Sequence, residues 1–312
     1  MTTSIAFLFP GQGSQAAGMG KELAAKYSVA RRTFEEADAA LGMHLSQLCF
    51  EGPDDQLRMT EITQPAILTV SVATWRVLEE HGVKPTFVAG HSLGEYSAHV
   101  AAGTLGFADA VRTVNKRGKY MQEAVPAGVG AMAAILGMDG AAVTQLCVDA
   151  AQGAVCQAAN INSPEQIVIS GDKAAVERAA ALATERGAKK AVLLPVSAPF
   201  HCSLMQPAQD RLGADLHTLT LRKPSVPVMC NVDAALVDTA DGSRDALIRQ
   251  VTGAVRWDEC VRGLISRGVE TFVEVGPGKV LLGLMRQIDR SKTSLQTSDD
   301  VALQKALAQL AA

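Results

Sequence analysis

A serine lies at the centre of a short segment with glycines on both sides, Gly90-His-Ser-Leu-Gly94. This G-x-S-x-G pattern stands between a predicted strand over 86–89 and a predicted helix that begins at Glu95. A serine on such a tight strand-to-helix turn projects its Oγ out of the sheet, and the glycines leave room for the turn. Ser92 is therefore the candidate nucleophile. The alternative is a glycine-rich turn that contains a serine by chance.

The serine needs a base, because its hydroxyl is a weak nucleophile near neutral pH. Of the six histidines, His91 adjoins the serine but is expected to point elsewhere, and His99 lies on the following helix. Three others are expected at the protein surface, in helices or at their ends: His44, His81 and His217. By elimination the best candidate is His201, which stands in an irregular proline-punctuated loop over 195–202. Such loops often carry catalytic side chains.

A second glycine-containing segment, over 11–16, follows the first predicted strand and formally fits the G-x-G-x-x-G/A fingerprint of dinucleotide-binding proteins. The acidic residues about twenty positions later, Glu35 and Glu36, fall inside a predicted helix and not at the end of a second strand, which argues against nucleotide binding. We interpret the segment as a source of oxyanion donors. The Gln12 N–H would face the Leu93 N–H, which opens the helix after the serine.

Four cations lie on the predicted helix over 107–124, and helical spacing prevents them from sharing one face: Arg112, Lys116, Arg117 and Lys119. A surface role is the default for each of them. An arginine that reached inward could bind a carboxylate through two parallel hydrogen bonds, and Arg117 is the candidate for that role.

The order of the predicted elements indicates an α/β fold. Helical patterns over 20–41 and 65–81 and strands over 5–9 and 86–89 alternate in a way typical of a parallel sheet with helices on both faces. Between residues 128 and 197 the pattern changes to βαββαβ, which is typical of a small ferredoxin-like unit. We therefore predict a large α/β domain of residues 1–127 plus 198–312, interrupted by a small ferredoxin-like insertion over 128–197.

Composition excludes several classes of protein. The 312 residues include 29 Lys+Arg and 32 Asp+Glu, and a net charge of −3 argues against nucleic-acid binding through bulk charge. The apolar run over 5–9 is too short for a signal peptide, and no uncharged stretch is long enough to span a membrane. The six cysteines lack C-x-x-C spacing, so we expect buried or free thiols, with no disulfide framework and no metal site. A cytoplasmic location is expected.

Together these segments resemble the malonyl-CoA:acyl carrier protein transacylases of bacterial fatty-acid synthesis. The resemblance covers essentially the whole chain. Seven segments look like that family's motifs, in its order: Phe9-Pro-Gly-Gln-Gly-Ser-Gln15, Thr63-Gln-Pro-Ala66, Gly90-His-Ser-Leu-Gly-Glu-Tyr-Ser97, Gly118-Lys-Tyr-Met-Gln122, Gly130-Ala-Met132, Phe200-His201 and Glu274-Val-Gly-Pro-Gly-Lys-Val280. The implied fold is an α/β-hydrolase-like large domain with an inserted ferredoxin-like small domain.

The resemblance implies a role for each residue that matches a motif. Ser92 would be the acylated nucleophile and His201 its base, and the main-chain carbonyl of Gln250 would orient the histidine ring. The N–H groups of Gln12 and Leu93 would form the oxyanion hole. The chain departs from the family pattern just after Gln250, because Gly253-Ala254 stand where relatives commonly have Asn-Pro.

Substrate contacts are implied in the same way. Arg117 would hold the malonyl carboxylate, and the bulky Phe200 would leave little space for an α-methyl group, a discrimination of about 1–3 kcal/mol. Three further residues are candidate substrate-binding positions: Gln64, Met121 and Asn162.

The implied activity is a ping-pong transfer of malonyl from malonyl-CoA to the phosphopantetheine thiol of acyl carrier protein, through a malonyl-Ser92 ester. No metal or redox cofactor is expected, and nothing in the sequence demands more than a monomer. The acidic carrier would need a local basic patch, for which the candidates are Lys189, Lys190, Lys279, Arg286, Arg290 and Lys292. The alternatives are a stand-alone acyltransferase of a polyketide synthase, a serine thioesterase or hydrolase on the same fold, and a non-catalytic dinucleotide-binding or scaffold protein.

Overall fold

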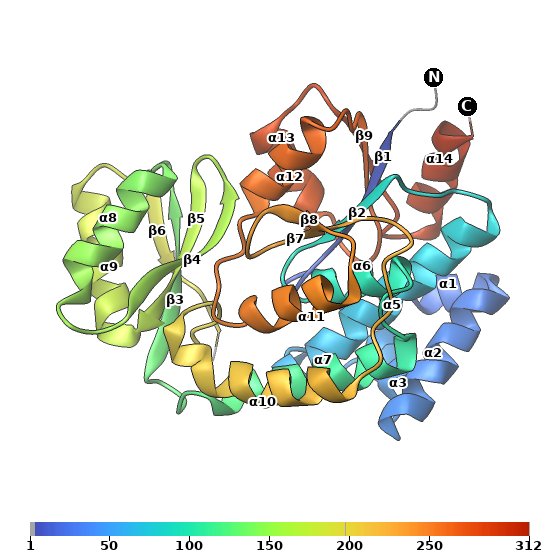
Figure 1. The fold of residues 1–312 in the computed structure, drawn as a ribbon, viewed down its shortest axis with the longest axis horizontal. Helices are drawn as coiled ribbons and strands as arrows, with labels where there is room; N and C mark the ends of the chain where they lie inside the picture. Colours follow the sequence, from blue (N-terminus) through green and yellow to red (C-terminus); the bar gives the residue numbers. More distant parts are fainter. Residues whose placement is uncertain (1–3, 197, 312) are drawn as a thin grey trace.

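The chain folds around two β-sheets that lie beside each other (Figure 1). The computed structural model describes residues 4–196 and 198–311. The larger sheet has the order β10-β9-β1-β2-β7-β8, in which all neighbours are parallel except β7 and β8. Its strands are β1 (Ile5–Phe9), β2 (Phe87–Gly90), β7 (Val228–Cys230), β8 (Ala235–Val237), β9 (Thr271–Glu274) and β10 (Thr293–Gln296).

Side chains alternate across the larger sheet, so that each strand contributes to two apolar layers. In β1, Ala6 and Leu8 join a buried cluster with helices α12 (Trp257–Ile265) and α13 (Val280–Ile288). Phe7 and Phe9 point the other way, into the largest buried cluster. The remaining helices of this domain are α1 (Lys21–Lys26), α2 (Ser28–Leu41), α3 (Leu45–Glu51), α4 (Asp54–Leu57), α5 (Thr60–Glu80), α6 (Gly94–Ala101), α7 (Phe107–Glu123), α10 (Gln206–Thr218), α11 (Ala240–Arg249) and α14 (Asp300–Leu310), with a short 3₁₀ helix over Ser203–Met205.

The smaller sheet is antiparallel throughout and has the order β4-β5-β3-β6. Its elements follow one another as β3 (Gly130–Leu136), α8 (Gly140–Ala151), β4 (Cys156–Ser163), β5 (Gln166–Asp172), α9 (Lys173–Glu185) and β6 (Lys190–Leu193). Helices α8 and α9 share a third apolar cluster with the sheet. The predicted βαββαβ unit and the mixed α/β fold class are confirmed. The domain boundaries stay predictions, and the second of them falls on residue 197, outside the described residues.

The helical pattern predicted over 20–41 is wrong at one point, because two helices share this stretch. Tyr27 lies between them in an extended conformation, with φ −113° and ψ 122°. Its hydroxyl donates to Asp300 Oδ1 at 2.8 Å, at the start of α14. This contact joins segments 273 positions apart, so no local pattern could have predicted the break.

Helix α5 starts earlier than predicted, at Thr60, and holds Pro65 in its interior. Proline has no N–H to donate to the carbonyl four residues before it, which here is Glu61 O. The Asn115 Nδ2 donates to Glu61 O at 2.8 Å and satisfies that carbonyl from the neighbouring helix α7. A proline inside the helix is therefore tolerated, and the prediction that the helix begins there is wrong.

All six cysteines are buried and free, as predicted. Within the described part of the chain, no helix combines the length and apolar character that a membrane span requires.

Candidate active site

The turn after β2 holds Ser92 in a tightly packed elbow. A Cβ on Gly90 would lie 1.9 Å from the backbone of Gly94, and one on Gly94 would lie 2.0 Å from Phe9 O. Only glycine fits at both positions, so the two glycines allow helix α6 to start directly behind the turn. Ser92 itself has φ 51°, in the left-handed region. This is the geometry that the G-x-S-x-G pattern predicts.

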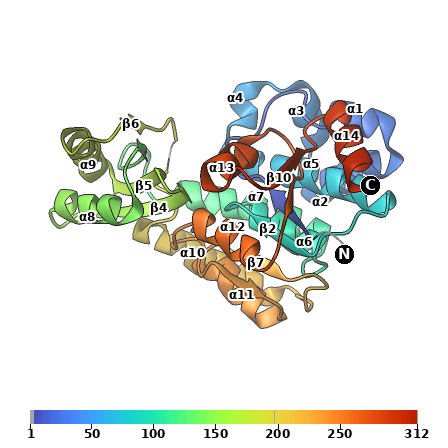
Figure 2. The same ribbon diagram turned by 90° about the horizontal axis from the view of Figure 1, so that it is seen from above.

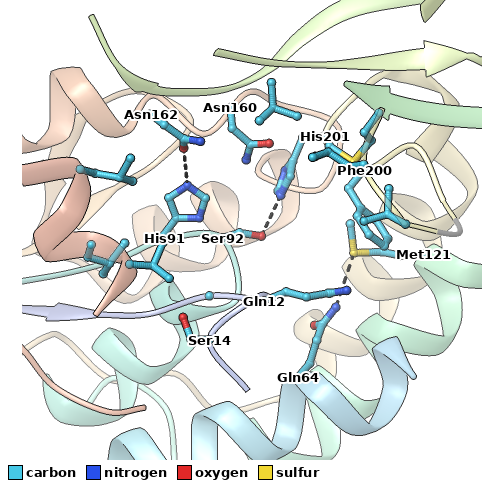
Figure 3. Close-up of a pocket in the computed structure, with 18 of the residues that line it drawn as sticks. Gln12, Ser14, Gln64, His91, Ser92, Met121, Asn160, Asn162, Phe200 and His201 are labelled. Atoms are coloured by element: carbon cyan, nitrogen blue, oxygen red, sulfur yellow. Dashed lines mark hydrogen bonds between the residues drawn. The ribbon is translucent and has the colours of Figure 1, made fainter. Parts of the chain in front are cut away.

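His201 meets the serine at the turn. The Ser92 Oγ lies 2.7 Å from His201 Nε2 (Figure 3). The other ring nitrogen, Nδ1, lies 2.9 Å from Gln250 O and 3.1 Å from Gly253 O. Because carbonyls only accept hydrogen bonds, Nδ1 carries the proton, and Nε2 is left to accept the serine proton. The arrangement fits a nucleophile and base, with two carbonyls in place of a third acidic residue.

Two backbone N–H groups lie close to the serine in the fold. Gln12 follows β1 and lines the same cavity as Ser92, and Leu93 is the N-cap residue of α6. Among residues 4–196 and 198–311, neither N–H has a hydrogen-bond acceptor. Two unpaired donors beside a nucleophile are what an oxyanion hole requires. The Leu93 side chain is buried and does not line the cavity.

Arg117 reaches inward from α7, whereas Arg112, Lys116 and Lys119 are exposed, as helical spacing predicts. Its guanidinium donates to Gln64 Oε1 at 2.9 Å, to Gln250 Oε1 at 3.0 Å and to Ser92 Oγ at 3.2 Å. No carboxylate of the described residues forms an ion pair with it. A buried guanidinium with only neutral partners is an apt site for an anionic substrate group, because an added carboxylate would neutralise it.

The cavity around these residues has a volume of about 230 Å³ and lies between the two sheets. Eight of the ten predicted site residues line it: Gln12, Gln64, Ser92, Arg117, Met121, Asn162, Phe200 and His201. All of these except Arg117 are labelled in Figure 3. Gln250 and Leu93 lie behind this layer and are fully buried.

The whole chain is similar to one group of known proteins. A family model described as acyl transferase domain matches residues 6–307. The malonyl CoA-acyl carrier protein transacylase of Salmonella typhimurium is 51% identical over 308 residues, which cover 98% of this chain and 100% of that protein. The solved structure of the transacylase of the same name from Coxiella burnetii has a TM-score of 0.97 and 46% identity, and covers 99% of this chain and 98% of that one. A malonyl-transacylase solved in complex with its type II PKS acyl carrier protein has a TM-score of 0.96 and 45% identity, and covers 98% and 100% of the two chains.

The chain belongs to this transacylase family.

The segment after Gln250, where the sequence is expected to depart from the family pattern, contacts the histidine ring. Gly253 O accepts from His201 Nδ1. Backbone bonds from Ile161 N to Val255 O and from Val255 N to Ala159 O tie this segment to β4. In this member of the transacylase family, the loop whose carbonyls contact His201 is therefore anchored on the smaller sheet.

Sequence reasoning missed several polar side chains of the site, and three of them bear directly on its geometry. His91 and Asn160 both line the cavity, and His91 Nε2 lies 2.8 Å from Asn162 Oδ1. His91 therefore lies in the cavity, although its ring bonds Asn162 and not Ser92, as expected. The ring packs edge-on against Trp257, with 5.5 Å between ring centroids. Asn160 and Asn162 are two apart on β4 and hence on one face of the strand, a signal that could have paired them.

Asn231 is the third residue that was missed. It follows β7 and is fully buried. Its Oδ1 accepts from Ser92 N at 2.7 Å and its Nδ2 donates to Gly90 O at 2.8 Å, so it holds both ends of the elbow. A polar residue at the carboxyl end of a parallel strand is a recognised signal for a functional site in open α/β sheets.

The surroundings keep the base neutral. Burial, together with the nearby Arg117 charge, lowers the pKa of His201 to about 3. Burial also lowers the pKa of the Arg117 guanidinium. A neutral imidazole is the form that can accept the serine proton.

The residues that were not chosen as site candidates lie where the sequence predicts them. His44, His81 and His217 are exposed, and Glu35 and Glu36 lie inside α2. Among the described residues, no cluster of three or more His, Cys, Asp or Glu side chains is arranged to hold a metal ion.

Proposed function

We propose that this protein transfers the malonyl group of malonyl-CoA to the phosphopantetheine thiol of acyl carrier protein through a malonyl ester of Ser92. The observation that carries the proposal is the 2.7 Å contact between Ser92 Oγ and His201 Nε2, in a cavity that also holds the buried Arg117. A hydroxyl nucleophile, a neutral base and a cation suit a short acyl chain that ends in a carboxylate.

In the first half-reaction the malonyl carboxylate binds the Arg117 guanidinium. Ser92 Oγ attacks the thioester carbonyl carbon while His201 Nε2 accepts the hydroxyl proton. The negative charge on the carbonyl oxygen is stabilised by the N–H groups of Gln12 and Leu93. When the tetrahedral intermediate collapses, the C–S bond breaks, and the CoA sulfur leaves with the proton held by His201.

The second half-reaction reverses these steps with a different thiol. His201 accepts the proton of the phosphopantetheine thiol, whose sulfur attacks the carbonyl carbon of the malonyl-Ser92 ester. The C–O bond breaks, and Ser92 Oγ regains its proton from His201. Both half-reactions exchange one ester or thioester for another, so the chemistry requires no oxidant, reductant or metal ion.

We propose that the protein acts as a cytoplasmic monomer. The nucleophile, base, guanidinium and oxyanion donors all come from one chain, which supports a monomer. The six free, buried thiols suit a reducing compartment, which supports the cytoplasm.

The test is to incubate the protein with malonyl-CoA and to measure its intact mass. The expected result is an added mass of about 86 Da, the arithmetic of a covalent malonyl ester, which is absent in Ser92→Ala. A chase with carrier thiol should release the label into the carrier faster than water releases it as malonate. The absence of an adduct would refute the transfer and favour a scaffold protein. Equal release to the carrier thiol and to water would refute it and favour a hydrolase.

The second candidate function concerns only the carrier. The structural relative in complex with a type II PKS acyl carrier protein is 45% identical to this chain, which supports a polyketide carrier as the alternative acceptor. Comparing kcat/KM for purified carriers of the two kinds decides between them.

A further inference from the structure

A second groove lies on the side of helix α13 that faces away from the catalytic cavity. It is formed by α13, β10 and α14 and has a volume of about 540 Å³. In Figure 2, β10 lies between these two helices. The helix α13 contributes Leu281 and Leu284 to the catalytic cavity, and Leu282 and Arg286 to the groove.

The groove is positively charged in a protein whose net charge is −3. Three of its twelve lining residues are cations, Lys279, Arg286 and Lys305, and none is acidic. None of the three cations forms an ion pair with a carboxylate of the described residues, whereas the nearby Lys292 is paired with Glu270 at 2.6 Å. Three unpaired cations in one concave site favour an anion with several charges, such as a phosphorylated nucleotide.

The groove begins at the rim of the catalytic cavity. Val280 lines that cavity and is 48% exposed, and the preceding residue, Lys279, lines the groove. The catalytic cavity, at about 230 Å³, is smaller than the roughly 300–1,000 Å³ of sites that enclose drug-sized ligands. A CoA thioester is larger than such ligands, so its nucleotide end must lie outside the cavity.

We infer that this groove binds the phosphate-bearing nucleotide end of the CoA substrate, through Lys279, Arg286 and Lys305. The inference rests on the proposed function. Free phosphorylated nucleotides share the same chemistry and would compete for the groove.

The test compares two malonyl donors, malonyl-CoA and malonyl-pantetheine, which lacks the nucleotide. In the double variant Arg286→Gln/Lys305→Gln, the KM for malonyl-CoA should rise about tenfold with kcat unchanged, because two charge-assisted phosphate contacts are lost. The KM for malonyl-pantetheine should stay at the wild-type value. Adenosine 3′,5′-bisphosphate should compete with malonyl-CoA in the wild type and compete less well in the double variant. Arg290→Gln is the matched control, because Arg290 is exposed near the end of α13 but does not line the groove.

An unchanged KM for malonyl-CoA, or an equal rise for both donors, would overturn the inference. A rise in the KM for the carrier alone would also overturn it and would make the groove a carrier-docking surface. Adduct formation by the wild type is measured first, so a failure of the proposed function is seen separately.

A different observation, a buried carboxylate beside the nucleophile, carries a second inference. Glu95 lies on the first turn of α6 and is fully buried. Its Oε2 accepts from Gln250 Nε2 at 2.8 Å and from Asn231 N at 2.9 Å. The mechanism above assigns Glu95 no step.

Glu95 determines which way the Gln250 amide faces. The Gln250 Nε2 donates to Glu95 Oε2 and also to Ser92 O at 2.9 Å, so its Oε1 is turned toward Arg117 Nη2. The same Nη2 contacts Ser92 Oγ. The chain of hydrogen bonds therefore runs from Glu95 through Gln250 to Arg117 and the nucleophile.

We propose that Glu95 is a positioning residue that places the Arg117 guanidinium for the malonyl carboxylate. An alanine at this position would remove the acceptor that holds Gln250 Nε2, so the Gln250 amide could turn and leave Arg117 without its acceptor. The proposal also rests on malonyl transfer as the function.

The test is the selectivity between malonyl-CoA and acetyl-CoA in Glu95→Ala. We expect kcat/KM for malonyl-CoA to fall about tenfold, the loss of roughly one charge-assisted hydrogen bond, while acetyl loading falls less. Glu274→Ala is the matched control, since Glu274 is equally buried but accepts from backbone N–H groups at the start of α13, those of Leu281 and Leu282 among them. It should lower the melting temperature and keep the selectivity. Equal losses with both donors in Glu95→Ala, at a fold confirmed by circular dichroism, would show a merely structural role.

Discussion

Ser92 and His201 share a left-handed backbone conformation, with φ 51° and 59°, and their side chains meet at 2.7 Å across 109 positions of sequence. Such conformations cost non-glycine residues roughly 1–3 kcal/mol each and persist only where the surroundings enforce them. Here Asn231 holds the serine backbone, and the carbonyls of Gln250 and Gly253 hold the histidine ring. The strained backbone conformations, and the hydrogen bonds that enforce them, therefore lie at the two residues that exchange a proton.

Replacing Arg117 with alanine should separate malonyl from acetyl loading. We expect kcat/KM for malonyl-CoA to fall about 100-fold, because a charged hydrogen-bonded pair contributes up to about 3 kcal/mol. Acetyl-CoA has no terminal carboxylate, so its loading should change far less. Lys116→Ala, on an exposed position of the same helix, is the control. Equal losses with both donors would show that the guanidinium does not bind the carboxylate.

The acid limb of the pH profile should lie unusually low. The pKa of His201 is lowered to about 3 by burial and by the Arg117 charge, so the base stays neutral as the pH falls below the ordinary histidine range. We expect kcat/KM for acetyl loading, which needs no contact between Arg117 and a carboxylate, to stay flat from pH 8 to about pH 5, since kcat/KM reports ionisations of the free enzyme. With acetyl-CoA as donor, Arg117→Gln should move the acid limb to higher pH, because a positive charge near the base is removed. An acid limb near pH 6.5 in the wild type would contradict this description of the base.

Phe200 should restrict the acyl group at its α-carbon. Its ring lines the cavity and is 9% exposed. Replacing it with alanine should raise kcat/KM for methylmalonyl-CoA relative to malonyl-CoA by about tenfold, within the 1–3 kcal/mol that one methyl group contributes. Competition between the two donors in one reaction measures the ratio directly. An unchanged ratio would mean that another part of the wall sets the selection.

His99 should lower the stability of the protein, increasingly so in acid. It is fully buried, neither ring nitrogen has a partner among the described residues, and burial lowers its pKa to about 3. Between pH 6.5 and 3 the unfolded chain binds a proton at this residue that the native state does not bind. The free energy of unfolding therefore falls as the pH falls, by up to about 1.4 kcal/mol per pH unit.

His99→Leu should remove this dependence. The variant should be more stable than the wild type by about 1–3 kcal/mol at neutral pH, the cost of an unsatisfied buried polar group, and the difference should grow below pH 6.5. Urea unfolding of both proteins at pH 7 and pH 5 measures it, and the other titrating groups cancel in the comparison. A difference that is constant with pH would show that the pKa of His99 is not lowered in the folded protein.

The sequence alone was sufficient for features that depend on neighbouring residues. The elbow follows from the spacing of Gly90, Ser92 and Gly94, because steric limits act over a few residues. The βαββαβ order of the smaller unit follows from local periodicity in the same way. Helical spacing showed that the cations of α7 cannot share a face, and the motif resemblance singled out Arg117 as the one that turns inward.

Only the tertiary structure decided which distant groups meet. His201 was the best remaining histidine by elimination, but its contact with Ser92 requires the fold to bring the two loops together. His91 and Asn160 were missed because their place in the cavity depends on packing between the two sheets. Asn231 was missed because its bonds to Ser92 and Gly90 join segments 139 and 141 positions apart. The break at Tyr27 and the proline inside α5 were missed for a related reason, since the hydroxyl bond to Asp300 and the amide bond from Asn115 come from distant elements. Hydrogen bonds and packing between distant segments are set by the folded topology, and no local pattern records them.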